Sequence, residues 1–174
     1  MKTIIKPLIP AFLTALLLIG CGGSKLPKPT PLATFTPAAG IQKIWSTNAN
    51  DGNEDLNIKL TPVSENELIY TAGNKGEVSA INLSNGKKVW QQHYEDFSFS
   101  SNLALNADSL YLGTDKAQIV KLDKIDGKLI WVKPVPSTVI AAPTATENNV
   151  FAKTINGEIT TLNPQTGTAI WNYQ

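Results

Sequence analysis

Cys21 is the residue of this chain whose setting most clearly indicates chemistry. It is the only cysteine among 174 residues, so it has no disulfide partner within the chain. It follows Leu-Ile-Gly at residues 18–20, at the end of an apolar run over residues 11–19 that comes after Lys2 and Lys6. That run is too short to cross about 30 Å of hydrocarbon and is typical of a removable signal peptide. We therefore predict cleavage before Cys21 and lipidation of its nucleophilic sulfur.

The residues after Cys21 predict where the lipid anchor places the protein. Gly22, rather than Asp, follows the cysteine. In the bacterial sorting rule that this pattern resembles, Asp at that position retains a lipoprotein in the inner membrane. We therefore expect an outer-membrane protein that faces the periplasm. Residues 21–40 include four prolines among small polar residues, which is typical of an extended tether. The expected organisation is a signal peptide at 1–20, a flexible tether at 21–40 and a folded domain at 41–174.

Residue types that carry out catalysis are scarce in the rest of the chain. His93 is the only histidine, so neither a multi-histidine metal site nor a Ser-His-Asp arrangement with spare candidates is supported. We expect His93 to have a structural role at the surface. Two acidic groups could bind calcium, at residues 95–96 and at residues 51–55, but solvated loops are also rich in acids. We predict no catalytic residue, no metal ligand and no cofactor.

The charged residues argue against nucleic acid as a partner. All fifteen cationic residues are lysines, and the formal net charge is only +1. Phosphate backbones need clustered cations, which a nearly neutral chain does not supply. The absence of arginine also removes the planar guanidinium groups that usually hold carboxylate or phosphate ligands.

The strongest signal for the fold is an internal repeat of about 40 residues. Its markers are four tryptophans, and each of the last three lies four residues after a glycine that follows a short polar turn. The tryptophans are Trp45, Trp90, Trp131 and Trp171, and the glycines are Gly86, Gly127 and Gly167. Asn82, Asp123 or Asn163 begins each of these turns. Glycine readily takes the positive φ that such a turn demands.

Each repeat also contains the pattern of several short strands. An aromatic residue ends an apolar strand, a tight turn follows at Gly76, Ala117 or Gly157, and the next strand alternates towards the polar turn. A further candidate strand precedes each unit, at residues 56–61, 102–106 and 142–146. Four short strands in about 40 residues are one blade of a β-propeller.

Two other folds fit the sequence less well. A β-sandwich with core tryptophans predicts uneven spacing, and frequent Gly, Asn and Pro interrupt any helical period. We therefore predict an all-β partial propeller of three four-stranded blades, at about 55–94, 98–134 and 138–174, with one extra N-terminal strand at Trp45.

The repeat Gly-x-(Val/Ile)-x-x-(Ile/Leu)-(Asn/Asp)-x-x-x-Gly-x-x-x-Trp resembles the tryptophan-docking repeat of quinoprotein-like β-propellers. In those folds each tryptophan packs against the neighbouring blade. Together with Cys21, the Pro-rich tether and Ile-Trp-Ser at residues 44–46, the repeat is similar to the BamB family of lipoproteins. That resemblance implies a non-enzymatic scaffold of the outer-membrane β-barrel assembly machinery. The implied partners are the POTRA domains of a BamA-like protein and the membrane, through the lipid anchor.

The chain departs from that family in length. Eight blades of about 40 residues would need roughly 320 residues, so we expect a truncated or split member, or one that completes its ring with other chains. The family loop that binds the main partner follows the third full repeat, so no partner-binding residue is predicted here. Two alternatives stay open: a fragment of a quinone-dependent dehydrogenase, and a propeller lipoprotein that binds cell-wall or other polymers.

Overall fold

The computed structural model describes residues 29–34, 40–50 and 60–174. Cys21, the predicted signal peptide at 1–20 and the acidic group at 51–55 lie outside the described residues. Contacts divide the chain into two units, Met1–Ile41 and Gln42–Gln174. The described residues of the first unit form neither helix nor strand. No helix of the described chain is long and apolar enough to cross a membrane.

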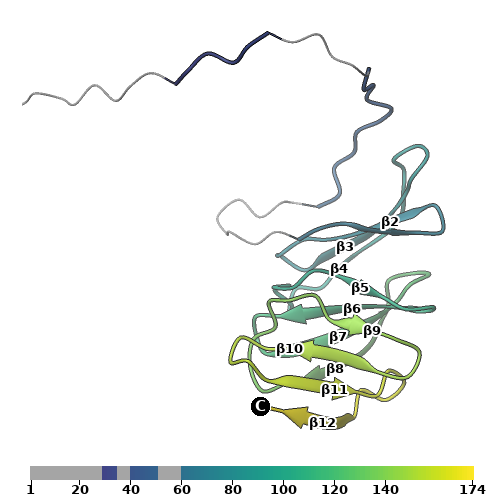
Figure 1. Cartoon of the computed structure of the whole chain (residues 1–174). Coiled ribbons are helices and arrows are strands. Elements are labelled where there is room, and N and C mark those ends of the chain that lie inside the picture. The colour runs from purple at the N-terminus through teal and green to yellow at the C-terminus, as the bar shows by residue number, and fades with distance from the viewer. Residues whose placement is uncertain (1–28, 35–39, 51–59) are drawn as a thin grey trace, which may run out of the picture. The chain divides into compact units, whose positions relative to one another are not determined.

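The second unit consists of three four-stranded antiparallel sheets, which follow one another in chain order (Figure 1). This arrangement confirms the predicted three blades. The first blade contains β1 (Val63–Glu65), β2 (Leu68–Ala72), β3 (Glu77–Asn82) and β4 (Lys88–His93). The second contains β5 (Ala104–Leu105), β6 (Ser109–Thr114), β7 (Gln118–Asp123) and β8 (Leu129–Pro134). The third contains β9 (Thr144–Ala145), β10 (Val150–Lys153), β11 (Ile159–Leu162) and β12 (Ala169–Tyr173).

Every strand of a blade pairs with its neighbour in sequence, so each sheet is a meander of hairpins. The central hairpins turn at Gly76, Ala117 and Gly157, where φ is +90°, +57° and +88°. These are the three positions that the sequence predicts for a tight turn. The repeated left-handed residue keeps each hairpin short, and so keeps the four strands of a blade in one sheet.

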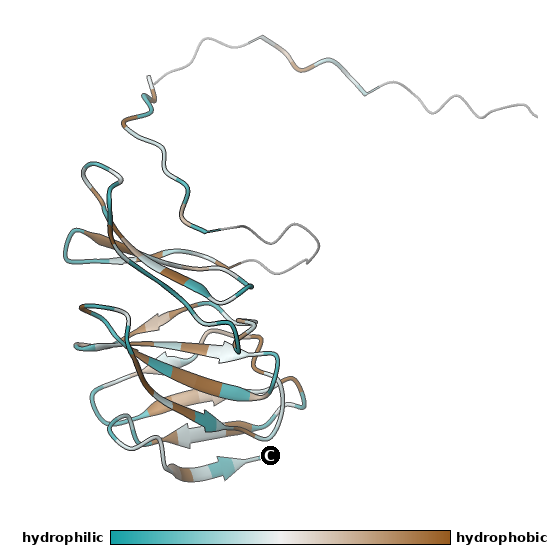
Figure 2. Cartoon of the chain, turned by 180° about the vertical axis from the view of Figure 1, so that it is seen from behind, coloured by the Kyte–Doolittle hydropathy of each residue, from teal (hydrophilic) through white to brown (hydrophobic). Residues whose placement is uncertain are grey.

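Apolar residues on the strands fill the spaces between successive blades. Figure 2 shows hydrophobic colour along the strands and hydrophilic colour at many of the turns. One core, which includes Val78 and Leu112, joins the first and second blades. A second core, which includes Ile119 and Val150, joins the second and third blades. Because side chains alternate along a strand, the central strands of the second blade contribute to both cores, one from each face of the sheet.

Two details of the N-terminal part differ from the sequence prediction. Residues 40–50, including Trp45, form no strand, although one was expected there. No further sheet of the described chain offers an edge with which this segment could pair. The first strand of the first blade was expected at 56–61, of which 56–59 lie outside the described residues. Leu60 and Thr61 form no strand, and β1 begins at Val63.

Candidate functional site

The polar turn before each tryptophan is closed by its first side chain. In the first blade, Asn82 Oδ1 accepts hydrogen bonds from the backbone N–H groups of Ser84 (3.0 Å) and Asn85 (3.2 Å). The N–H of Gly86 then donates to the carbonyl of Asn82, at 2.9 Å. Asp123 and Asn163 close the corresponding turns of the other blades. Short side chains with an acceptor are suited to this use, which explains the Asn or Asp in each repeat. We call residues 82–86, 123–127 and 163–167 the glycine turns.

A β-bulge follows each glycine turn and directs the tryptophan. In the first blade, Ala80 pairs with Trp90 while Ile81 pairs with Lys88, so one residue between them is extra. The same shift recurs in the other two blades. The extra residues are Val89, Ile130 and Ile170, which are 55%, 47% and 52% exposed. A bulge re-aims the side chains beside it, and here the re-aimed side chain is the indole.

Two of the indoles lie on the glycine turn of the next blade. The Trp90 N–H donates to the carbonyl of Lys124 at 3.3 Å, and a methyl group added to Gly127 would come within 2.6 Å of the Trp90 ring. The Trp131 N–H donates to the carbonyl of Pro164 at 3.1 Å, and its ring lies over Gly167. These two contacts connect the first blade to the second and the second to the third.

Trp45 makes the same contact with the first blade, although it lies on no strand. Its N–H donates to the carbonyl of Leu83 at 2.8 Å, and a methyl group on Gly86 would come within 2.5 Å of its ring. Leu83, Lys124 and Pro164 occupy the same position in their turns. The structure therefore brings Trp45 together with Gly86, as it brings the next two tryptophans together with Gly127 and Gly167.

Trp171 differs from the other three tryptophans because it meets no glycine turn of the described chain. Its side chain is 46% exposed, against 9% for Trp131. Its ring nevertheless packs on Phe151 with a centroid distance of 6.2 Å and an angle of 54°. The corresponding pair of Tyr111 and Trp131 has almost the same geometry, at 5.9 Å and 53°.

Other side chains reinforce the contacts between blades. Gln92 Nε2 donates to the carbonyl of Asp126 at 2.9 Å, and the Tyr94 hydroxyl donates to the carbonyl of Gly127. Burial, and to a smaller extent the charge of Asp126, raises the pKa of Tyr94 to about 12. Lys121 donates to the carbonyl of Pro164 at 2.8 Å, and burial lowers the pKa of its amine. These groups were not identified from the sequence, because their partners are backbone carbonyls of another repeat.

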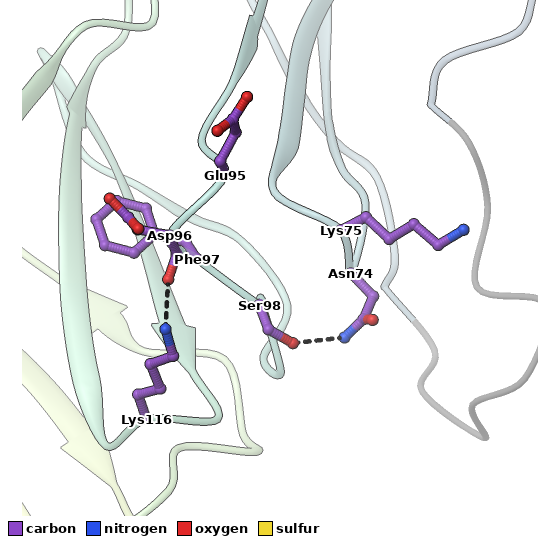
Figure 3. Close-up of a pocket in the computed structure, with 7 residues that line it drawn as sticks. All are labelled: Asn74, Lys75, Glu95, Asp96, Phe97, Ser98 and Lys116. Carbon is purple, nitrogen blue, oxygen red and sulfur yellow. Dashed lines mark hydrogen bonds between the residues drawn. The ribbon is translucent and has the colours of Figure 1, made fainter.

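A pocket of about 300 Å³ opens between the first two blades, at the end where the β2–β3 and β6–β7 turns lie (Figure 3). We call this end of the blades, together with the β10–β11 turn, the upper face. Lys116 Nζ donates to the carbonyl of Asp96 at 3.0 Å, and Asn74 Nδ2 donates to the Ser98 hydroxyl at 3.2 Å. The pocket also includes Glu95 and Lys75, so its charges are mixed. No group of three or more potential metal ligands occurs among the described residues.

His93 lies on β4 opposite Glu77 of β3, and its side chain is half exposed. Its Nδ1 is 3.4 Å from Glu77 Oε1, while Glu77 itself is buried and its Oε2 has no hydrogen-bond partner among the described residues. The hydroxyl of Thr71, on the same face of the sheet, is also buried and has no partner in the described part of the chain. The polar character of this face was missed from the sequence. The available signal was Thr71 and Ser79 at positions where the second repeat has Leu112 and Val120.

Comparisons with known proteins agree with this geometry. The family model for outer membrane protein assembly factor BamB matches residues 74–174, which include three of the four indoles. The outer membrane protein assembly factor BamB of Salmonella typhimurium is 30% identical over 159 residues, which cover 82% of this chain and 40% of that protein. The chain therefore spans less than half the length of that relative.

Solved structures support the fold. BamB from Moraxella catarrhalis superposes with a TM-score of 0.60 and 23% identity, over 68% of this chain and 36% of that one. Quinohemoprotein alcohol dehydrogenase from Comamonas testosteroni gives a TM-score of 0.57 at 20% identity, over 67% of this chain and 21% of that one. Both likenesses concern the propeller fold and not a shared activity. The match of the family model over more than half of the residues decides the family: the chain belongs to the outer membrane protein assembly factor BamB family.

Proposed function

We propose that this chain is a non-enzymatic scaffold lipoprotein that serves the assembly of β-barrel proteins in the outer membrane. The observation that carries the proposal is the family match over residues 74–174. Those residues contain two complete interblade contacts, of Trp90 with Gly127 and of Trp131 with Gly167. Such contacts stabilise a platform of stacked sheets and leave the turns at both ends of the blades available for protein partners.

The tryptophans have a structural role in this proposal. Trp45, Trp90 and Trp131 fasten each glycine turn to the element before it, through ring packing over glycine and an indole hydrogen bond. Aromatic side chains bury a large apolar area, so contacts of this kind contribute strongly to the packing of neighbouring blades. The stack then presents the upper face, which includes exposed Ile140 and Ile155 beside a pocket of about 380 Å³. We assign no individual partner-binding residue on this face.

Lipidation of Cys21 is the second part of the proposal. Several acyl chains on one cysteine would hold the protein firmly, because each buried CH₂ contributes about 0.8 kcal/mol. Cells that express the full chain and are fed a labelled fatty acid should incorporate label into it, and the label should fractionate with the outer membrane. The Cys21→Ser variant should carry no label. Label on the Cys21→Ser variant, or an unlabelled unchanged chain, would contradict this part.

A partner resembling BamA, through its periplasmic POTRA domains, is the third part. A photo-crosslinking residue at Ile155, on the upper face, tests one end of the blades, and one at Ile125, on the β7–β8 turn, is the matched position at the other end. We expect one of the two positions to yield a crosslink to the barrel-forming subunit of the assembly machinery. Crosslinks only to unrelated proteins, or a pull-down that recovers only glycan, would contradict the assignment.

One observation favours a second candidate, a piece of a quinone-dependent dehydrogenase: the likeness to quinohemoprotein alcohol dehydrogenase. The residues of this chain fit that chemistry poorly. It has no arginine and a single cysteine, and no cluster of potential calcium ligands occurs in its described part. We therefore expect no oxidation of alcohols or sugars when quinone and calcium are added to the purified chain. Turnover above the rate without protein would support the dehydrogenase instead.

A further inference from the structure

The exposed apolar side chains of the first two blades gather at one place. Over residues 60–134, all of which the structure describes, five large apolar side chains are exposed. Each lies in a glycine turn or at the start of the strand that follows the turn: they are Leu83, Val89, Ile125, Leu129 and Ile130. Ile125, in the β7–β8 turn, is 84% exposed. Exposed apolar groups that cluster in this way are typical of an interaction surface.

The docked indoles place these exposed residues beside one another. Val89 directly precedes Trp90, which docks on the glycine turn that contains Ile125. Ile44, which is 87% exposed, directly precedes Trp45, which docks on the glycine turn of the first blade. The exposed residues of the N-terminal segment and of the first two blades therefore form one row. We call residues 43–44, 83–89 and 124–130 the rim.

The rim is also basic, because it contains five lysines and one acidic residue. Lys124 pairs with Glu65 at 2.5 Å. Lys128 pairs with Asp126 at 2.7 Å, and its side chain is 77% exposed. The other three lysines are exposed and form no ion pair within the described part of the chain: they are Lys43, Lys87 and Lys88. The rim therefore offers positive charge beside exposed aliphatic groups.

Neighbouring surfaces differ from the rim in charge. The β1–β2, β5–β6 and β9–β10 turns at the same end carry Glu67, Asp108 and Glu147. The connections at the upper face contain two lysines and four acidic residues, over residues 73–76, 94–103, 115–117, 135–143 and 154–158. The glycine turn of the third blade and the start of β12, residues 163–170, carry no charge. The combination of lysines and aliphatic groups is therefore a property of the rim.

The predicted tether enters the folded unit at the rim. That unit begins at Gln42, directly before Lys43 and three residues before the docked Trp45. A chain of about 20 residues spans roughly 25 Å when flexible and at most about 60 Å as polyproline II. Acyl chains on Cys21 would therefore hold the rim close to a bilayer. A tether of this length gives an effective concentration in the millimolar range, so a weak contact between the rim and the bilayer suffices.

We propose that the rim docks on the surface of an anionic phospholipid bilayer. Ile125 and the neighbouring aliphatic side chains enter the interfacial layer, while Lys87 and Lys88 meet the lipid phosphates. Lysine suits this position, because its apolar stem lies along the boundary while its amine stays among the headgroups. The upper face, with Ile155, then points away from the bilayer and stays available to protein partners. The inference extends the lipid-anchor part of the proposed function and rests on that part for the strength of the contact.

Fluorescence quenching with the full chain on vesicles tests the proposal. A fluorescent side chain replaces Ile125 in one sample and Ile155 in another, and the lipid acyl chains carry nitroxide quenchers. On vesicles of phosphatidylethanolamine and phosphatidylglycerol, the probe at 125 should be quenched and the probe at 155 should not. Quenching at 125 should fall on vesicles of phosphatidylcholine alone. It should also fall at high salt, because salt screens exposed charges.

Removal of two rim lysines gives the size of the effect. Lys87→Gln combined with Lys88→Gln should lower the ratio of docked to undocked chain about 25-fold, because each lysine near an anionic surface contributes about fivefold. Lys75→Gln combined with Lys153→Gln is the matched control. It removes two exposed lysines at the upper end of the blades and should leave quenching at 125 unchanged. Equal effects of the two pairs would overturn the proposal.

Flotation of the same samples separates this inference from the proposed function. A chain that floats with anionic vesicles while the probes at 125 and 155 are quenched equally is anchored but not docked. That result overturns the inference and leaves the scaffold role intact. A chain that does not float contradicts the lipid anchor instead. Its rim is still present, so at high vesicle concentration quenching at 125 must still depend on Lys87 and Lys88, or the inference is wrong as well.

Discussion

The glycine in each glycine turn meets two demands at once. Gly127 has a φ of +76°, and it lies under the ring of Trp90 with no space for a methyl group. Conformational freedom alone would allow Asn at such a position, but close approach of the indole does not. Gly86 and Gly167 meet the same two demands. The repeat therefore keeps glycine at a position where backbone shape and interblade packing coincide.

Gly127→Ala should destabilise the protein more than Gly157→Ala. Both residues have a positive φ, but nothing lies within 4 Å of a methyl group at Gly157. Gly157→Ala should therefore cost only about 1 to 2 kcal/mol of backbone strain. Gly127→Ala should add about 1 to 3 kcal/mol for overpacking against Trp90. Urea unfolding of the two variants measures the difference, and equal costs would mean that the indole does not press on the turn.

Tyr94 makes stability depend on alkaline pH. Its pKa in the folded protein is about 12, above the ordinary value of 10.0, because burial disfavours the phenolate. Its contribution is therefore complete below pH 10 and is lost as the pH rises through 12. Tyr94→Phe should lower the free energy of unfolding at neutral pH by about 1 kcal/mol, because the carbonyl of Gly127 loses its donor.

The same Tyr94→Phe variant should lose less stability than the unchanged chain between neutral pH and pH 11. Urea unfolding at the two pH values measures this, with Tyr173→Phe as a control at an exposed position. Identical alkaline losses in Tyr94→Phe and the unchanged chain would show that Tyr94 does not ionise with unfolding.

At the scale of elements, residues 42–50 and the face of the first blade that they cover are less apolar than the interface between the first two blades. The second blade buries Leu112 and Val120 against the blade before it, and the third buries Val150, Ala152 and Thr160, whereas the first blade buries Thr71, Ser79 and Glu77. A buried polar group without a partner is costly, and a segment that covers such groups is easily opened.

Thr71→Val should stabilise the protein, by about 1 kcal/mol, because it removes a buried hydroxyl that has no hydrogen-bond partner among the described residues. Thr154→Val is the matched control. Thr154 is also buried, but its hydroxyl donates to the carbonyl of Glu158 at 3.0 Å, so its loss should destabilise by a similar amount. Thermal unfolding of both variants decides the question. A lower melting temperature for Thr71→Val would show that the hydroxyl has a partner in solution.

The sequence allowed the strands and turns of the blades to be predicted because they are local. Turn residues such as Gly76 and Asp123 act within a few positions, and each recurs three times with a similar φ or side-chain role. The contacts between repeats were harder to predict. Gln92 and Tyr94 bind backbone carbonyls about 33 residues away, and any residue type can supply a carbonyl. The prediction of a strand at Trp45 was wrong. Trp45 nevertheless makes the same contact with a glycine turn as Trp90 and Trp131 do.

At the scale of the whole molecule, stability comes from neighbouring sheets that bury each other, as in other repeat proteins. Two apolar cores and two indole contacts join the three blades in order. Lys124 adds an ion pair to Glu65 of the preceding blade, at 2.5 Å. Because each blade depends on its neighbours, damage to an interblade contact should destabilise more than one sheet.

The central claim is that the tryptophans join successive elements by docking on the next glycine turn. The most direct measurement is the exchange of the indole N–H protons with solvent, followed by NMR at concentrations where the chain is monomeric. The N–H groups of Trp90 and Trp131 should exchange slowly, that of Trp45 faster because residues 42–50 belong to no sheet, and that of Trp171 fastest. If Trp90 and Trp131 exchange as fast as Trp171, the indoles do not fasten the blades and the account is wrong.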